Sequence, residues 1–187
     1  CAPTHPAWDL SQPAPAPATP APSVPAQLPS VERGAPLYVE KCAGCHGVGG
    51  AGDGASAAGI RAQGKTVPSL INPALLRSAS PAAWHAVVSN GRIANLMPPF
   101  AQSLSEQQRW DVLAYVYALG QPADALITGR QVFENDCARC HPSTAFAAPQ
   151  VFASRSLAAI EGALARPPQH ANLNLTPAQA ATMANVV

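Results

Sequence analysis

The chain has 187 residues and a formal net charge of +1, with 48% apolar residues but only 5% aromatic and 11% charged residues. This length suits one large domain or two small ones. The near-zero charge argues against a nucleic-acid partner, because phosphate binding needs a basic face. No apolar run approaches the roughly 20 residues of a membrane-spanning helix. Much of the apolar content is alanine, so we expect something besides side chains to fill the core.

A proline- and alanine-rich tract follows the first residue and continues to about residue 30. Proline fixes φ and lacks a backbone N–H donor, so this tract can form neither a helix nor a central strand. We therefore predict an extended, polyproline-like tether over residues 1–30.

The remainder of the chain contains a degenerate internal repeat. Residues 34–42 (GAPLYVEKC) align with residues 129–137 (GRQVFENDC), with a glycine, an aromatic residue and a cysteine at matching positions. The repeat predicts two tandem domains, over residues 31–122 and 123–187.

The local signals along the chain are helical. Ser105 is a good N-cap for a helix over residues 106–119, in which apolar residues recur at helical spacing. A second helix is predicted over residues 81–89, after a Ser-Pro start signal. Residues 47–64 are rich in glycine and are predicted to form a loop. No segment shows the alternation typical of a strand, so we expect an all-α fold.

Two copies of one cysteine–histidine motif carry the chemistry. Residues 42–46 (CAGCH) and 137–141 (CARCH) share the C-x-x-C-H spacing at matching places in the repeat. This spacing is the attachment signal for c-type haem, because two thiols one helical turn apart form thioethers to the porphyrin and the next histidine binds the iron. A structural zinc site would need further soft ligands. A thioredoxin-like pair is the other alternative, and duplication of the whole motif favours haem.

With these motifs, residues 31–187 resemble the class I c-type cytochrome family in a tandem di-haem form. The resemblance implies two small all-α bundles, each wrapped around one covalently bound haem c, which would explain the thin side-chain core. It also implies that the cysteines of the two motifs carry the thioethers and that the histidines are the proximal iron ligands. These residues are Cys42, Cys45 and His46 in the first domain, and Cys137, Cys140 and His141 in the second.

The resemblance further implies a loop proline whose carbonyl group steadies each proximal histidine, and a methionine on the other face of the iron. Pro68 stands at the expected place in the first domain, and Pro149 is the nearest candidate in the second. Met97, in the sequence LMPPF before the predicted final helix, is the expected sixth ligand of the first haem; the alternative is a loop hydrophobe. His85 is a rival ligand by chemistry, but it falls inside a predicted helix, where the family has packing or surface residues.

The second domain departs from the family pattern, because no methionine precedes its final helix. When residues 104–108 (LSEQQ) are aligned with residues 175–179 (LTPAQ), the region around His170 falls opposite Met97. We therefore predict His170 as the sixth ligand of the second haem. Met183 is the alternative, and the third possibility is an iron that is open or bound by another ligand. Ligation by two histidines would make the second haem the lower-potential one, because the thioether of methionine favours ferrous iron. Electrons would then run from the second haem to the first.

The first and last residues of the sequence allow predictions about how the protein is processed and anchored. Cys1 is the odd one of five cysteines, and a leading cysteine before a proline–alanine tether resembles a bacterial lipoprotein. We expect a lipid on Cys1, unless trimming of the chain produced this terminus. Haem attachment takes place outside the cytoplasmic membrane, so both features predict a lipid-anchored protein on the periplasmic side of the bacterial cytoplasmic membrane. The helix predicted from Thr176 is still running at Val187, which suggests that a natural C-terminal tail is missing.

The expected function is electron transfer by a membrane-tethered di-haem cytochrome c, because two six-coordinate irons leave no position for a substrate. We expect no catalytic residues, and a subunit of a respiratory or photosynthetic complex, for example one resembling alternative complex III in quinol oxidation. The tether would contact other subunits of that complex; a freely moving shuttle is the other version.

A di-haem peroxidase-like enzyme with an open second haem is the alternative function, and a haem-based gas sensor is a third. Glu161 is the only acidic residue between Cys140 and the end of the chain, so no distal acid–base group is evident there. This argues against the peroxidase.

Overall fold

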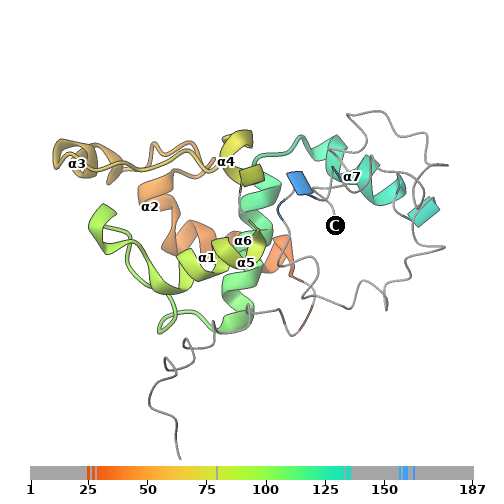
Figure 1. Cartoon of the computed structure of the whole chain (residues 1–187), viewed down its shortest axis with the longest axis horizontal. Helices are drawn as coiled ribbons and strands as arrows, with labels where there is room; N and C mark the ends of the chain where they lie inside the picture. Colours follow the sequence, from red (N-terminus) through yellow and green to blue (C-terminus); the bar gives the residue numbers. More distant parts are fainter. Residues whose placement is uncertain are drawn as a thin grey trace, which may run out of the picture.

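The computed structural model describes residues 29–78 and 80–132, together with positions 25, 27, 134–135, 156, 158–159 and 162. Its elements are α1 (Val31–Lys41), α2 (Ala43–His46), α3 (Ala57–Ala62), α4 (Pro73–Ser78), α5 (Pro81–Asn90), the 3₁₀ helix η1 (Ile93–Asn95), α6 (Glu106–Leu119) and α7 (Ala123–Val132), as Figure 1 shows. Within these described ranges there is no strand, only an isolated antiparallel bridge. The predicted all-α fold is therefore confirmed for this part of the chain.

Several sequence predictions fall on residues outside that part. They are the lipid at Cys1, nearly all of the tether over 1–30, the second motif at residues 137–141, Pro149, His170, Met183 and the helix predicted from Thr176. The division into two tandem domains likewise stays a prediction. None of the helices in the described part is long and apolar enough to cross a membrane.

The two longest predicted helices form where local capping signals placed them. The Ser105 hydroxyl accepts a hydrogen bond from the Gln108 N–H at 3.2 Å, and the Gln108 Oε1 accepts one from the Ser105 N–H at 2.8 Å. This reciprocal capping box starts α6 at Glu106. At α5, the Ser80 hydroxyl accepts from the Ala83 N–H at 3.2 Å, and a proline occupies the first turn.

Two short helices were not predicted. The loop prediction for residues 47–64 was wrong at its end, because α3 occupies residues 57–62. Alanine is the strongest helix former, which favours a helix in this alanine-rich turn. The burial of Ala57 adds a packing contact that offsets the low helix propensity of the exposed Gly59. The other short helix, α4, follows Asn72, whose Oδ1 accepts a hydrogen bond from the Ala74 N–H at 3.0 Å.

Helix α1 crosses α6, and this crossing is the main packing contact of the domain (Figure 1, orange on green). Gly34 of α1 is buried there, and a Cβ added to it would overlap the carbonyl oxygen of Asp111 on α6. Tyr38, one turn further along, is fully buried, with its ring centroid 5.2 Å from that of Tyr115. The crossing therefore brings the middle of α1 against the middle of α6.

The apolar core borders a cavity on several sides. One buried cluster joins α1 to α6 and includes Tyr38, Leu70 and Val112. A second buried cluster joins α5 to α6 and includes Val88 and Leu113. All five of these residues also line the cavity described below. This arrangement agrees with the expectation that side chains alone do not fill the core.

Candidate cofactor site

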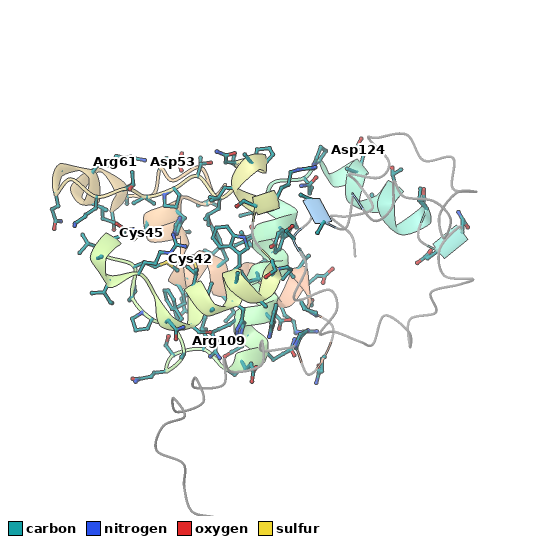
Figure 2. The ribbon with its side chains drawn as sticks, in the orientation of Figure 1. Cys42, Cys45, Asp53, Arg61, Arg109 and Asp124 are labelled. Carbon is teal, nitrogen blue, oxygen red and sulfur yellow. The ribbon has the colours of Figure 1, made fainter. Side chains whose placement is uncertain are left out.

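The first cysteine–histidine motif lies at the junction of α1 and α2. Cys42 joins the two helices, and its N–H donates to the Tyr38 carbonyl at 2.8 Å, which continues the turn of α1. The single turn of α2 then carries Cys45 and His46, and the His46 N–H donates to the Cys42 carbonyl at 2.9 Å. Figure 2 shows both cysteines inside the helical domain. The helical geometry therefore sets the two thiols one turn apart.

A glycine-rich loop wraps around the end of α2. The Gly52 N–H donates to the His46 carbonyl at 2.7 Å, and the Gly54 N–H donates to the Cys45 carbonyl at 3.2 Å. A Cβ at Gly54 would lie 2.5 Å from two carbonyl oxygens of the motif, so only glycine permits this approach. The loop thus satisfies the carbonyl groups that a four-residue helix leaves unpaired. This role of the loop was not predicted, although the clustering of glycines directly after the motif is its visible signal in the sequence.

The imidazole of His46 is positioned by the loop that contains Pro68. Its Nδ1 lies 3.4 Å from the Pro68 carbonyl oxygen, and with the proton on Nδ1 the other ring nitrogen keeps its lone pair for a metal. Burial lowers the pKa of His46, and the hydrogen bond to Pro68 opposes that shift only in part. The neutral form, which is the form that ligates metals, is therefore favoured near neutral pH.

Met97 comes from a tight turn that lies about 50 residues after the motif in the chain. The Arg92 N–H donates to the Met97 carbonyl at 2.9 Å, and the Met97 N–H donates to the Arg92 carbonyl at 3.1 Å. Gly91 has a φ of 68°, and a Cβ there would lie 2.6 Å from the Met97 carbonyl oxygen. Leu96 has a φ of 62°, a left-handed conformation that costs a non-glycine residue about 1–2 kcal/mol. Hydrogen bonds and close backbone contact therefore hold Met97 in place.

These segments converge on one cavity of about 280 Å³. It is lined by the sequence-predicted residues Cys42, Cys45, His46, Pro68 and Met97. Most of the other lining side chains are apolar, and they come from α1, α3, α4, α5, α6 and the loops around Pro68 and Met97. The structure thus brings together all five residues predicted for the first site, although their roles as ligands stay predictions.

His85 lies apart from this group. It is 3% exposed, and its ring stacks on Trp110 with centroids 4.4 Å apart and 14° between the planes. It is not among the residues that line the cavity. Burial, together with the nearby charge of Arg109, lowers the pKa of His85. Its surroundings are those of a packed side chain between α5 and α6.

The chemistry of the lining fits a haem attached through thioethers. Burial, aided by the neighbouring Cys45, raises the pKa of the Cys42 thiol to about 11, so this cysteine is a neutral thiol at physiological pH. The Nε1 of Trp84, which also lines the cavity, is buried without a hydrogen-bond partner. A carboxylate at the edge of a bound group would satisfy this donor. Two thiols, an imidazole and a thioether around an apolar cavity are the donor set of a c-type haem.

The ranges that the structure describes contain no separate cluster of metal-binding side chains. No group of three or more histidine, cysteine, aspartate or glutamate side chains lies close enough there to hold a metal ion. Structural zinc sites draw four ligands, mostly from cysteine and histidine.

Comparison with known proteins agrees with this chemistry. The family described as cytochrome C oxidase, cbb3-type, subunit III matches residues 29–116. That range contains the first motif, Pro68 and Met97. The match supports a cytochrome c domain of the cbb3 type in this part of the chain, and such a domain implies covalently bound haem c.

The matching curated proteins are oxidase subunits by name. The chain is 30% identical over 127 residues to the Cbb3-type cytochrome c oxidase subunit FixP of Sinorhizobium medicae (strain WSM419), covering 62% of this chain and 40% of that protein. It is 32% identical over 123 residues to the Cbb3-type cytochrome c oxidase subunit FixPc of Rhizobium leguminosarum bv. viciae, covering 60% of this chain and 39% of that protein. The chain therefore spans about two fifths of the length of these relatives.

Among solved structures, the chain is similar to one chain of the Kuenenia stuttgartiensis reducing HAO-like protein complex. The TM-score is 0.40 at 16% identity, and the alignment covers 88% of this chain and 97% of that chain. A likeness of this size carries no argument about fold or function.

Proposed function

We propose that this chain is a di-haem cytochrome c that transfers electrons as a subunit of a respiratory membrane complex on the periplasmic side. The observation that carries the proposal is the convergence of Cys42, Cys45, His46 and Met97 on one largely apolar cavity. Among the complexes that the sequence left open, the names of the relatives favour an oxidase.

Each residue of the first site has a distinct role in this proposal. Cys42 and Cys45 would form the thioethers, and His46 would be the iron ligand of the motif, oriented by the Pro68 carbonyl. Met97 would be the second iron ligand from this part of the chain, held by the hydrogen-bonded turn that begins at Arg92. When bound, haem c supplies a one-electron iron couple. The lining is largely apolar, and with both His46 and Met97 bound to the iron no ligand position would remain for a substrate, so the site would suit a carrier better than a catalyst.

The second site is proposed from the sequence repeat. Its thioethers would form at Cys137 and Cys140, with His141 as the proximal ligand and His170 as the sixth ligand. Met183 is the alternative sixth ligand. The lipid on Cys1 and the contacts of the tether with other subunits stay predictions.

Counting haems in matched variants tests the proposal. The full chain would be produced with a c-type haem attachment system, and intact mass and the pyridine haemochrome spectrum would be recorded. We expect two haems in the parent protein, and one in a variant with both motif cysteines of the first domain changed to serine. The same loss is expected for the corresponding change at Cys137 and Cys140. Gly44→Ser is the matched control, because a Cβ at Gly44 meets no atom within 4 Å and both thiols remain.

Three outcomes separate the parts of the proposal. A parent protein without haem would refute it. A parent protein with one haem, lost only when Cys42 and Cys45 are changed, would reduce it to a mono-haem cytochrome. Loss of both haems in either double variant would show that the two sites do not load independently, which contradicts the tandem-domain division.

A further inference from the structure

Leu96 adopts a backbone conformation that leucine rarely takes. Among the residues that the structure describes, it is the one non-glycine with a positive φ, at 62°. The other positive-φ positions are all glycines, namely Gly47, Gly50, Gly52, Gly64 and Gly91. Glycine adopts this conformation freely, whereas the Cβ of leucine crowds the following carbonyl group. A leucine at a position that favours glycine points to a contribution from its side chain.

The turn around Leu96 is held by backbone hydrogen bonds. The Leu96 N–H donates to the Ile93 carbonyl at 2.9 Å, and the paired hydrogen bonds between Arg92 and Met97 close the turn on both sides. Because the backbone is fixed at both ends, the direction of the Leu96 Cα–Cβ bond is fixed as well. The neighbouring Met97 contacts the cluster formed by Val88, Trp110 and Leu113.

Leu96 stands where the cavity meets solvent. Its side chain lines the cavity, yet the residue is 42% exposed. Ile93, in the same turn, is 66% exposed and is not among the lining residues. Arg92 and Asn95 of this turn also line the cavity, but Leu96 is the exposed apolar residue of the turn that does so, whereas Ile93 does not.

We propose that Leu96 is a shield that keeps water and small external ligands away from Met97 and from the iron position of the first site. The left-handed turn is the device that directs this side chain over the cavity. This inference rests on the proposed function, because a shield matters only if Met97 is an iron ligand. A thioether is a weak ligand, so a water molecule or a small anion reaching the cavity would compete with it.

Ligand exchange at the iron tests the shield directly. In a Met183→Leu background, Met97 is the remaining methionine of the two in the chain, so the methionine-to-iron absorption band of the ferric protein reports on Met97 alone. The rates at which cyanide and imidazole abolish this band would be measured by stopped flow. We expect Leu96→Gly to raise the imidazole rate constant at least about tenfold, which corresponds to about 1.4 kcal/mol. The rate constant for the smaller cyanide should rise less.

Two further variants separate shielding from a general loosening of the turn. Leu96→Asn keeps a residue that tolerates the left-handed conformation but replaces the apolar cover by an amide, and it should also accelerate exchange. Ile93→Ala is the matched control, because it truncates the more exposed side chain of the same turn, and its rate constants should stay within about twofold of the parent. The midpoint of urea unfolding should not fall in Leu96→Gly, because glycine relieves the backbone strain.

The possible results separate failure of the Leu96 shield from failure of the proposed function. Unchanged exchange rates in both Leu96 variants, with the absorption band intact, would overturn the shield and leave the proposed function standing. Equal acceleration for both ligands, together with a lower urea midpoint, would show a loosened turn and also overturn it. Absence of the band in the haem-loaded background protein would refute ligation by Met97, and the shield with it.

Discussion

Arg33 on α1 forms a bidentate salt bridge with Asp111 on α6. The Arg33 Nη2 lies 2.8 Å from Oδ1 of Asp111, and the Arg33 Nε donates to Oδ2 at 2.8 Å. The same carboxylate accepts from the Ser30 N–H at 2.9 Å and from the Gln107 amide at 3.2 Å. Asp111 is 2% exposed, so a buried charge at the crossing of α1 and α6 is met by donors from both helices and from the segment before α1.

This carboxylate should make the stability of the domain depend on acid pH. Burial acts to raise the pKa of Asp111, but the hydrogen bonds from Arg33, Ser30 and Gln107 outweigh it and hold the pKa below its ordinary value. Because the pKa is lower in the folded state, Asp111 stabilises the fold above the unfolded pKa of about 3.9, and this contribution is lost as pH falls through the folded pKa. Asp111→Asn should lower the free energy of unfolding at neutral pH by about 1–3 kcal/mol.

Urea unfolding followed by circular dichroism, at neutral pH and at about pH 3, checks this expectation. The loss of stability on acidification should be smaller in Asp111→Asn than in the parent. Asp124→Asn is the matched control, because it makes the same chemical change at an exposed aspartate of α7. Equal pH dependence in the parent and in Asp111→Asn would contradict the role given to this carboxylate.

Gly34 should tolerate no side chain, because a Cβ there would overlap the Asp111 carbonyl oxygen. Gly34→Ala must push α1 away from α6, and we expect a loss of about 1–3 kcal/mol in the free energy of unfolding. Gly59→Ala is the control, since Gly59 lies in α3 with open space around its Cβ, and alanine there should stabilise by up to about 1 kcal/mol. Urea midpoints measure both changes; an unaltered midpoint in Gly34→Ala would disprove the close approach.

The sixth ligand of the second haem should be visible in the electron paramagnetic resonance spectrum of the fully oxidised protein. We expect two low-spin ferric signals, one of histidine–methionine type and one of bis-histidine type. His170→Ala should convert the second signal to high spin, Met97→Ala should convert the first, and Met183→Leu should leave both unchanged. A redox titration should then place the bis-histidine haem at the lower potential.

Two other kinds of spectrum would contradict this assignment of the iron ligands. Two methionine-type signals, with one lost in Met183→Leu, would replace His170 by Met183. A strong high-spin signal in the parent protein would reveal an open iron, and a peroxidase-like or sensing function would then replace the carrier function. Turnover of peroxide would decide between those two.

Local signals account for the features that were predicted correctly from sequence. The capping box at Ser105 and the Ser80–Pro81 start involve residues within one helical turn, so their sequence pattern specifies the helix ends directly. The spacing of Cys42, Cys45 and His46 is likewise a property of a single turn. By contrast, α3 formed where glycine content suggested a loop, because burial of Ala57 against the rest of the domain outweighed the local signal.

The sequence by itself therefore determined the helical class of the described part and named the residues predicted to attach and ligate a haem. Only the tertiary structure decided that these residues share one cavity, that Gly34 must be glycine and that Leu96 takes a left-handed turn at the cavity edge. The physical reason is the range of the interactions. Arg33 and Asp111 are separated by 78 positions in the chain and meet only when α1 crosses α6. Contacts of that kind arise from packing of whole helices and leave no pattern in neighbouring residues.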